Sequence, residues 1–346
     1  MTKVVHVLFS SKLGGAEQVA INISENLKTA YDFTYVSPAG SIQKCLTDAD
    51  IEYRTFNPKQ IFKFVRTMKA INPDIIHAHD FKASFLVNLL FHHIPIVTHI
   101  HQAPEWQTER NWKSIAFKYI GRKSAQVLYV SDYAKESYRY QDKLSNVTVI
   151  PNGIDMAQII KMASQKASQT FDLLFVGRLA EVKDPEKFVE IAQQLVVANS
   201  KLKIGIIGDG VLKDRISNLI QATPQIKLLG FQSNPYQYMA TAKVVLSTSK
   251  SDGFGLTMVE AALLGAIPIA PSIGGIAHTA IKVNGFIYMQ EDALVEFLTR
   301  LFTDTEFYQE NKARLASADL SYYDQPRFVE EIRRVYEEVL SDDRSC

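Results

Sequence analysis

Short apolar runs alternate along the chain with longer amphipathic stretches. The runs are nearly continuous in Val, Ile and Leu, which is typical of strands that are covered on both faces. The predicted strands are 3–9, 33–36, 74–78, 95–100, 126–130 and 147–150, then 171–176, 202–207, 226–229, 243–248 and 267–270. The helical patterns between them indicate right-handed βαβ units, so the sequence predicts an α/β protein with parallel sheets.

A turn signal interrupts this alternation near the middle of the chain. The Asn-Gly pair within "PNGID" (151–155) is followed by the polar stretch "KMASQKASQT" before the next strand. We therefore predict two Rossmann-like, doubly wound domains, residues 1–155 and 156–324. The amphipathic segment 325–341 is expected to form a helix that packs back on the first domain. Ligands of such folds bind at the carboxyl ends of the strands, so we expect a site in the cleft between the sheets.

Composition narrows the class of protein. The chain has 346 residues, 47% apolar and 22% charged, which is ordinary for a soluble globular protein with a full core. A net charge of +1 argues against a general polyanion binder. Cys45 and Cys346 form no disulfide or metal pattern, which fits a reducing compartment. The start of the chain has no signal-like pattern and no apolar run approaches about 18 residues, so we expect a cytoplasmic protein.

The segment "KSDGFGLTMVEAALLGAIPIA" (250–270) is a first candidate for chemistry. Asp252 follows a predicted strand, and a Gly-Phe-Gly turn leads into a helix that is expected to stop at Gly265. The amides of 254–257 would then be open to an anion. Glu260 lies about one turn into the helix. Taken alone, the segment also fits Asp252 as a helix N-cap and Glu260 as a solvent-exposed acid.

Three other loops follow strands of the same predicted sheet. The first carries Arg178 and Lys183, the second is "GDG" (208–210), and the third contains Gly274 and Gly275. Because the carboxyl ends of parallel strands share one edge, these loops are expected to converge. Open amides with an arginine fork and a lysine fit a diphosphate, and carboxylates accept hydrogen bonds from sugar hydroxyls.

Nine motifs occur in a familiar order along nearly the whole chain. They are "GGAEQ" (14–18), "DIIHAHD" (74–80), "IVTHIH" (96–101), "VSDYAKESY" (130–138), "VIPNGID" (149–155), "VGRLAEVKD" (176–184), "IGDG" (207–210), "DGFGLTMVEA" (252–261) and "GGI" (274–276). In this combination the chain closely resembles family 4 of the retaining, two-domain (GT-B) nucleotide-sugar glycosyltransferases.

The resemblance implies roles for individual residues. Arg178 and Lys183 would hold the donor diphosphate, and Glu260 would accept hydrogen bonds from the ribose hydroxyls. Asp252 stands near the donor sugar where the family usually has Glu, one methylene longer. His101 would touch the transferred sugar through its carbonyl or its side chain. The donor-contacting positions are Gly14, Gly15, Gly177, Gly253, Phe254, Gly255, Leu256 and Glu260. The family often follows "GGI" with Pro-Glu, whereas this chain has Ala277-His278.

The chemistry that the resemblance implies needs no metal and no other cofactor. Positioned cations and helix N-termini can stabilise the charge on a leaving phosphate. Retention in the family is described as front-face attack, with the leaving phosphate helping to take the acceptor's proton. The expected substrates are a UDP- or GDP-linked sugar and a hydroxyl acceptor on a lipid-linked or surface polysaccharide.

Other classes of protein or site stay open at this stage. "DAD" (48–50), before an expected strand "IEYRTF", resembles a metal site of another glycosyltransferase architecture, and His77, His79 and Asp80 could suggest a second metal. "GDGVLK" is only a partial dinucleotide fingerprint, so a dehydrogenase is disfavoured. A nucleotide-sugar 2-epimerase shares the architecture. A non-catalytic sugar-nucleotide-binding subunit would account for Asp252 and Ala277-His278.

Two segments combine basic and aromatic residues. Segment 105–123 is predicted to be a helix, and 59–69 has a similar composition. Such helices suit an anionic membrane surface, or they pack on the core and expose a basic face to water. Membrane docking would place the protein peripherally on the inner face of the cell membrane. Nucleic acid is not expected, because the basic excess is modest and no recognition motif occurs.

Overall fold

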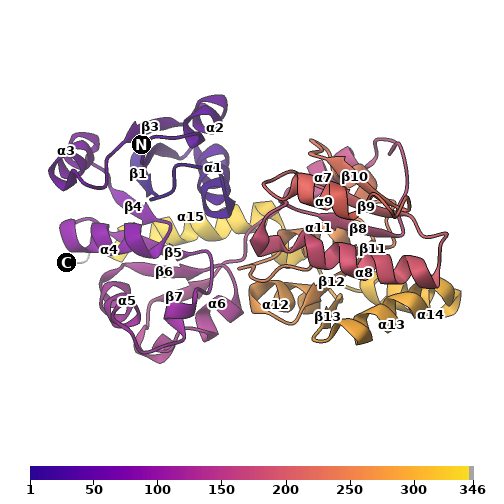
Figure 1. The fold of residues 1–346 in the computed structure, drawn as a ribbon. Coiled ribbons are helices and arrows are strands. Elements are labelled where there is room, and N and C mark those ends of the chain that lie inside the picture. Colours follow the sequence, from indigo (N-terminus) through magenta and orange to yellow (C-terminus); the bar gives the residue numbers. More distant parts are fainter. Residues whose placement is uncertain (343–346) are drawn as a thin grey trace. The chain divides into compact units, whose positions relative to one another are not determined.

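The computed structural model describes residues 1–342, which form two α/β units (Figure 1). The first unit contains Met1–Gly153 and the chain from Gln325 onward, and the second contains Ile154–Asp324. The division at Gly153 falls within the "PNGID" turn. Cys45 is a free, half-buried thiol, and Cys346 lies outside the described residues.

Seven parallel strands form the sheet of the first unit, in the order β3-β2-β1-β4-β5-β6-β7. They are β1 (Thr2–Val7), β2 (Tyr31–Ser37), β3 (Glu52–Thr55), β4 (Ile75–Ala78), β5 (Ile96–Ile100), β6 (Gln126–Tyr129) and β7 (Val147–Val149). β3 falls within the expected strand "IEYRTF". Of the two acids of "DAD", Asp48 ends the helix Ile42–Asp48 and Asp50 lies in the turn before β3 with φ 53°; both are exposed.

The helices of this unit are α1 (Gly15–Leu27), α2 (Ile42–Asp48), α3 (Ile61–Ile71), α4 (Phe81–Leu90), α5 (Trp112–Lys123), α6 (Asp132–Glu136) and α15 (Gln325–Asp342). The helix predicted over 105–123 was wrong in its first part. Only a 3-10 turn, Glu105–Gln107, forms there, and α5 begins after Asn111. The Asn111 side chain accepts from the Ser114 amide at 3.0 Å, and the Ser114 hydroxyl accepts from the Asn111 amide at 3.1 Å. This capping box fixes the start of α5.

The C-terminal helix α15 belongs to the first unit. Phe328, Ile332 and Tyr336 are buried against one face of the sheet, in a cluster with Val4 and Val97 of its central strands (Figure 1). Burying each such side chain stabilises the fold by about 1.5–3 kcal/mol. On the opposite face of the sheet, α3 and α4 pack against the alternate residues of β1 and β4. The sheet is therefore covered on both faces, as its continuous apolar strands predict.

Six parallel strands form the sheet of the second unit, in the order β10-β9-β8-β11-β12-β13. They are β8 (Leu173–Val176), β9 (Ile204–Ile207), β10 (Ile226–Gly230), β11 (Val244–Leu246), β12 (Ile267–Pro271) and β13 (Phe286–Tyr288). The sequence pattern missed β13, because a three-residue edge strand that is only half-buried has no clear periodicity.

The helices of the second unit are α7 (Met156–Ala163), α8 (Pro185–Ala198), α9 (Lys213–Leu219), α10 (Tyr236–Met239), α11 (Leu256–Leu263), α12 (Gly274–Lys282), α13 (Glu291–Thr303) and α14 (Thr305–Ala316). Gly265, with φ 78°, follows the end of α11, as predicted. Across residues 1–342, no helix is long and apolar enough to cross a membrane.

Both sheets share one topology. Each begins with a strand in its interior, extends one way for two further strands and then reverses to the other side. The order reverses between β1 and β4 in the first unit and between β8 and β11 in the second. Ligands of doubly wound sheets bind at such switch points, outside the carboxyl ends of the strands. The loops with Arg178, Lys183 and Asp252 follow β8 and β11, so they flank the second switch point.

Candidate functional site

The loop after β11 holds the loop after β8 in place. The Thr248 hydroxyl donates to the backbone carbonyls of Lys183 at 3.2 Å and Asp184 at 2.8 Å. The Lys250 amide donates to the Val182 carbonyl at 2.9 Å, and the Lys250 ammonium lies 3.1 Å from the Asp184 carboxylate. These contacts fix the 3-10 turn Glu181–Lys183 that carries one of the two predicted phosphate-binding cations.

Asp252 organises this edge of the sheet. Its Oδ2 forms an ion pair with Lys183, and its Oδ1 accepts hydrogen bonds from the amides of Phe254 at 3.1 Å and Gly255 at 2.9 Å. The N-cap of α11 is Gly255, with φ 78°, so Asp252 caps the turn before the helix rather than the helix itself. Two of the amides expected to be open to an anion, those of Phe254 and Gly255, are therefore donors to Asp252.

The glycine pair after β12 has a steric reason. The Gly275 amide donates to the Asp252 carbonyl at 3.1 Å, and a Cβ on Gly275 would collide with the Gly253 carbonyl. A Cβ on Gly255 would likewise run into the side chain of Ile276. The "GGI" and "DGFG" loops thus pack backbone against backbone, which only glycine permits.

The loops after β8 and β9 pack in the same way. A Cβ on Gly208 would overlap the Gly177 carbonyl, and one on Gly210 would overlap the Leu179 carbonyl. Arg178 lies in the chain between Gly177 and Leu179 and is exposed. Its guanidinium has no ion-pair partner within residues 1–342. The structure thus brings the four predicted loops together at one edge, with Arg178 open to solvent.

Glu260 is not the solvent-exposed acid that α11 alone would allow. Its side chain is half-buried, and Tyr236 of α10 donates its hydroxyl to Glu260 Oε1 at 3.2 Å. Burial raises the pKa of the Glu260 carboxyl, and the hydrogen bond from Tyr236 partly offsets this. No sequence motif pointed to Tyr236, because it lies in a short helix and meets Glu260 only through packing.

Gly14 and Gly15 lie in the first unit, where Gly14 is the N-cap of α1 and Gly15 its first residue. A Cβ on Gly14 would come within 2.7 Å of Glu17 Oε2. The Glu17 carboxyl is buried beneath this turn, and desolvation raises its pKa. The glycine at position 14 therefore makes room for a carboxylate of its own helix.

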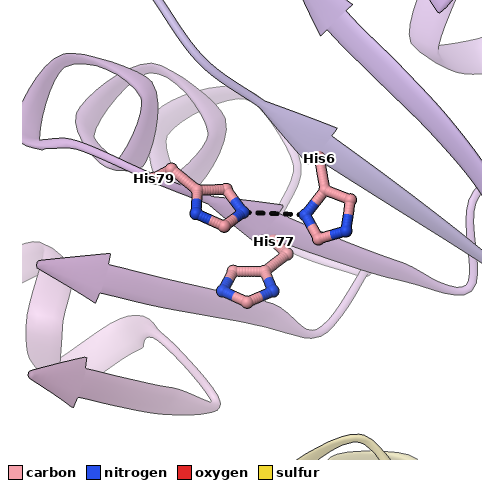
Figure 2. A group of neighbouring side chains, drawn as sticks. All are labelled: His6, His77 and His79. Atoms are coloured by element: carbon pink, nitrogen blue, oxygen red, sulfur yellow. Dashed lines mark hydrogen bonds between the residues drawn. The ribbon is translucent and has the colours of Figure 1, made fainter. Parts of the chain in front are cut away.

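His101 follows β5 in the first unit and belongs to a group of five histidines. The others are His6, His77, His79 and His99, all fully or almost fully buried. Figure 2 shows His6 and His79 turned toward each other, with His77 beside them. Burial lowers the pKa of all five; that of His6 and of His101 falls to about 3. All five rings are therefore neutral at neutral pH.

Two sets of these side chains have the composition of a metal site. Ligand atoms of His6, His77 and His79 lie within 4.8 Å of one another, and so do those of His79, His99 and His101. The sequence suggested a metal site of His77, His79 and Asp80 as one alternative. Asp80 instead caps α4, accepting from the Ala83 amide at 2.6 Å, and accepts from the Phe9 amide at 3.3 Å.

Comparison with known proteins places this geometry in context. The family model for Glycosyltransferase Family 4 matches residues 13–158, and the model for Glycosyl transferases group 1 matches residues 157–316. The structure of Anabaena Alr3699/HepE in complex with UDP superimposes with a TM-score of 0.80 at 20% identity, covering 97% of this chain and all of the other. The Rickettsia africae glycosyltransferase structure gives a TM-score of 0.77 at 18% identity, covering 98% of each chain.

Two curated relatives cover most of the chain. The capsular polysaccharide biosynthesis glycosyltransferase CapH of Staphylococcus aureus is 23% identical over 300 residues, 79% of this chain and 82% of its own. The GDP-mannose:cellobiosyl-diphosphopolyprenol alpha-mannosyltransferase of Xanthomonas campestris is 23% identical over 324 residues, 84% of each chain. The two parallel sheets define the GT-B class of transferase, which confirms the predicted fold. The chain belongs to glycosyltransferase family 4 and is a glycosyltransferase.

Proposed function

We propose that this enzyme is a retaining glycosyltransferase that moves a sugar from UDP or GDP to a hydroxyl of a lipid-linked or surface polysaccharide precursor. The observation that carries the proposal is the edge of the second sheet, where Arg178 and Lys183 stand at the switch point near a half-buried Glu260. Two cations match a diphosphate, and a carboxylate matches the ribose hydroxyls.

The relatives support a UDP- or GDP-linked donor. Anabaena Alr3699/HepE is described in complex with UDP and with UDP-glucose, and the Xanthomonas enzyme uses GDP-mannose. In this chain Arg178 and Lys183 would hold the diphosphate, and Glu260 the ribose. The remaining turn amides, from Gly253 and Leu256, would reach the sugar and the phosphates.

The proposed reaction is a front-face displacement. The acceptor oxygen forms a bond to the anomeric carbon on the face from which the nucleoside diphosphate leaves. The bond between the anomeric carbon and the phosphate oxygen breaks, and the acceptor's hydroxyl proton passes to the departing phosphate. The sugar keeps its anomeric configuration. Arg178 and Lys183 stabilise the negative charge that grows on the leaving phosphate, and this stabilisation needs no metal ion.

The relatives and the surface of the first unit support a lipid-linked or surface polysaccharide acceptor. CapH belongs to capsule synthesis, and the Xanthomonas enzyme acts on a diphosphopolyprenol. On α5, Trp112, Ile115 and Tyr119 form an exposed stripe, flanked by the exposed Lys113 and Lys123. Such a stripe would dock on an anionic membrane that holds the acceptor, with the enzyme peripheral on the inner face.

Thermal unfolding with UDP, GDP, ADP, CMP and NAD, each with and without EDTA, tests the donor. A ligand at about 100 times its dissociation constant adds roughly 2.7 kcal/mol of stability. We expect a shift with UDP or GDP that EDTA leaves unchanged. A shift with NAD alone, or one that requires added metal, contradicts the proposal. No shift with any nucleotide would contradict a nucleoside-diphosphate donor.

Turnover of the Arg178→Ala and Lys183→Ala variants tests the site. Both side chains act on charge that develops in the transition state, so kcat should fall by about 100-fold, with a smaller change in KM. Lys201→Ala, an exposed lysine of the same unit, is the matched control and should be unchanged. Wild-type rates in both site variants would remove Arg178 and Lys183 from the site.

Flotation with vesicles tests the membrane surface. The protein should bind vesicles of phosphatidylglycerol but not of phosphatidylcholine, and binding should weaken as salt rises. The double variant Lys113→Glu/Lys123→Glu should lose binding, whereas Lys201→Glu should keep it. Equal binding of all three proteins would show that α5 is not the docking surface.

A further inference from the structure

The five histidines of the first unit form two hydrogen-bonded rows. In the first row, His6 Nδ1 lies 2.7 Å from His79 Nε2, and His79 Nδ1 lies 3.0 Å from His101 Nε2. The second row contains the other two rings: the Tyr336 hydroxyl lies 2.7 Å from His77 Nδ1, and His77 Nε2 lies 3.2 Å from His99 Nδ1. Each row crosses from strand to strand, because β1, β4 and β5 are adjacent in the sheet.

The nitrogens in these rows pair end to end instead of converging on one point. His79 uses one nitrogen toward His6 and the other toward His101, so these three rings cannot all direct lone pairs at a single ion. Both nitrogens of His77 are taken by Tyr336 and His99, although the ring stacks 4.1 Å from that of His79 (Figure 2). A chain of N–H···N hydrogen bonds accounts for these contacts.

The hydrogen bonds of such a chain can be donated in only two directions. Each ring is neutral, so each has one N–H and one bare nitrogen. Either His6 donates to His79, which donates to His101, or every bond runs in the opposite direction. The first sense places the proton of His101 on Nδ1. The second places it on Nε2 and leaves an N–H on His6 Nε2.

The two ends of the row decide between these senses. His6 Nε2 is buried without a hydrogen-bond partner in the described part of the chain, and the His6 ring is fully buried and stacked on Phe33 at 5.3 Å. An N–H there would remain unsatisfied, which is costly inside a protein. His101 Nδ1 is also buried without a partner within residues 1–342, but the His101 residue is partly exposed in the loop after β5, whereas His6 lies inside the core. The His101 end of the row is therefore the end nearer to the surface, and we place the substrate there.

We propose that His6 and His79 are positioning residues that fix the tautomer of His101, so that His101 presents its Nδ1–H as a hydrogen-bond donor to a sugar oxygen. The inference rests on the proposed function for the identity of that oxygen, whereas the tautomer itself is a property of the free protein. The donor would favour hydroxyl or carbonyl oxygens of the substrate and would disfavour a group that can only donate.

Nitrogen-15 NMR of the histidine rings tests the tautomer directly. In uniformly labelled wild-type protein, the His101 signals, assigned by their loss in His101→Gln, should show a protonated Nδ1 and a bare Nε2. A proton on Nε2 of His101 overturns the proposal. This measurement needs neither substrate nor activity.

Two substitutions at His6 separate hydrogen bonding from packing. His6→Phe keeps a ring but cannot donate, so His101 should move toward the Nε2–H form, and kcat should fall by about tenfold, the scale seen when a partner that fixes a histidine tautomer is lost. His6→Asn places an amide N–H near the position of Nδ1 and should restore both the tautomer and the rate. Tyr336→Phe alters only the second row, so His101 should keep its Nδ1–H.

The outcomes also distinguish this inference from the proposed function. An unchanged His101 tautomer in His6→Phe would show that His6 does not fix that tautomer, whichever sugar the enzyme transfers. If the tautomers are as expected but the protein binds no nucleoside diphosphate, His6 and His79 still fix the tautomer of His101, and the proposed function is overturned instead.

Discussion

Asp252 has more partners than its place in the motif indicates. The Asp252 carboxylate forms an ion pair with Lys183 and accepts hydrogen bonds from two turn amides, and the Asp252 side chain is only 16% exposed. The shorter side chain of Asp, compared with the Glu that is usual in the family, allows it to fold back onto the amides two and three residues ahead. The ion pair partly neutralises Lys183, one of the two cations proposed to hold the donor.

Replacing Asp252 by Asn separates these two roles. The amide oxygen can still accept from Phe254 and Gly255, but the charge that faces Lys183 is gone. We expect the Asn variant to bind the nucleoside diphosphate about two- to fivefold more tightly, because an ion pair of this kind is worth about 0.5–1 kcal/mol. Calorimetric titration measures the change. Asp252→Ala, which also loses the turn, should bind more weakly, and identical affinities in both variants would mean that the ion pair does not compete with the ligand.

The sequence predicted the edge at which these residues lie but not their partners. Arg178, Lys183 and Asp252 follow predicted strands, so a parallel sheet brings them to one edge. The pairing of Lys183 with Asp252, or of Tyr236 with Glu260, depends on how loops pack across that edge, and no local pattern encodes it. The same is true of His6 and His101, which are joined only through the order of β1, β4 and β5.

Between elements, the glycine loops act as spacers. The "GGI" segment, whose two glycines begin α12, touches the backbone of the "DGFG" turn before α11, and a Cβ on Gly255, Gly274 or Gly275 would meet the facing segment. The motif spacing was visible in the sequence, but its steric cause was not. The glycines therefore fix the position of the Asp252 loop, besides any contact with a ligand.

Gly275→Ala tests this packing. Its Cβ would meet the Gly253 carbonyl, a backbone atom that cannot rotate away, so the second unit should lose about 1–3 kcal/mol of stability. Gly15→Ala is the matched control, because an added Cβ meets nothing within 4 Å there. Urea unfolding of both variants measures the difference. Equal midpoints would mean that the two loops can separate at little cost.

At the scale of the whole molecule, the strands were easier to predict than their order. The strongly apolar central strands were found, and the class of fold followed from their alternation with helices. The strand order that the seven-stranded and the six-stranded sheet have in common, and the switch point that it places beside Arg178 and Asp252, could not be read from the pattern. The short edge strand β13 was missed, and the start of α5 was misplaced because the Asn111 capping box has no apolar signature.

The buried histidines make the first unit sensitive to acid. Their pKa is lowered by burial from an ordinary value of 6.5, to about 3 for His6 and His101. Below pH 6.5 the unfolded chain therefore binds protons that the folded unit does not, so the free energy of unfolding falls as pH falls. Each such histidine contributes up to about 1.4 kcal/mol per pH unit through this window.

His6→Phe measures that contribution. Both tryptophans, Trp106 and Trp112, lie in the first unit, so their fluorescence during urea unfolding reports on it alone. Between pH 6.5 and 5, the variant should lose stability less steeply than the wild type, by up to about 1.4 kcal/mol per pH unit. Subtracting the pH dependence of the variant from that of the wild type removes the contribution of buried carboxyls such as Glu17, because both proteins contain them. His93→Gln, at an exposed position, should follow the wild-type slope. Parallel curves for His6→Phe and the wild type would mean that His6 binds protons equally in both states, and would contradict a lowered pKa of His6 in the folded unit.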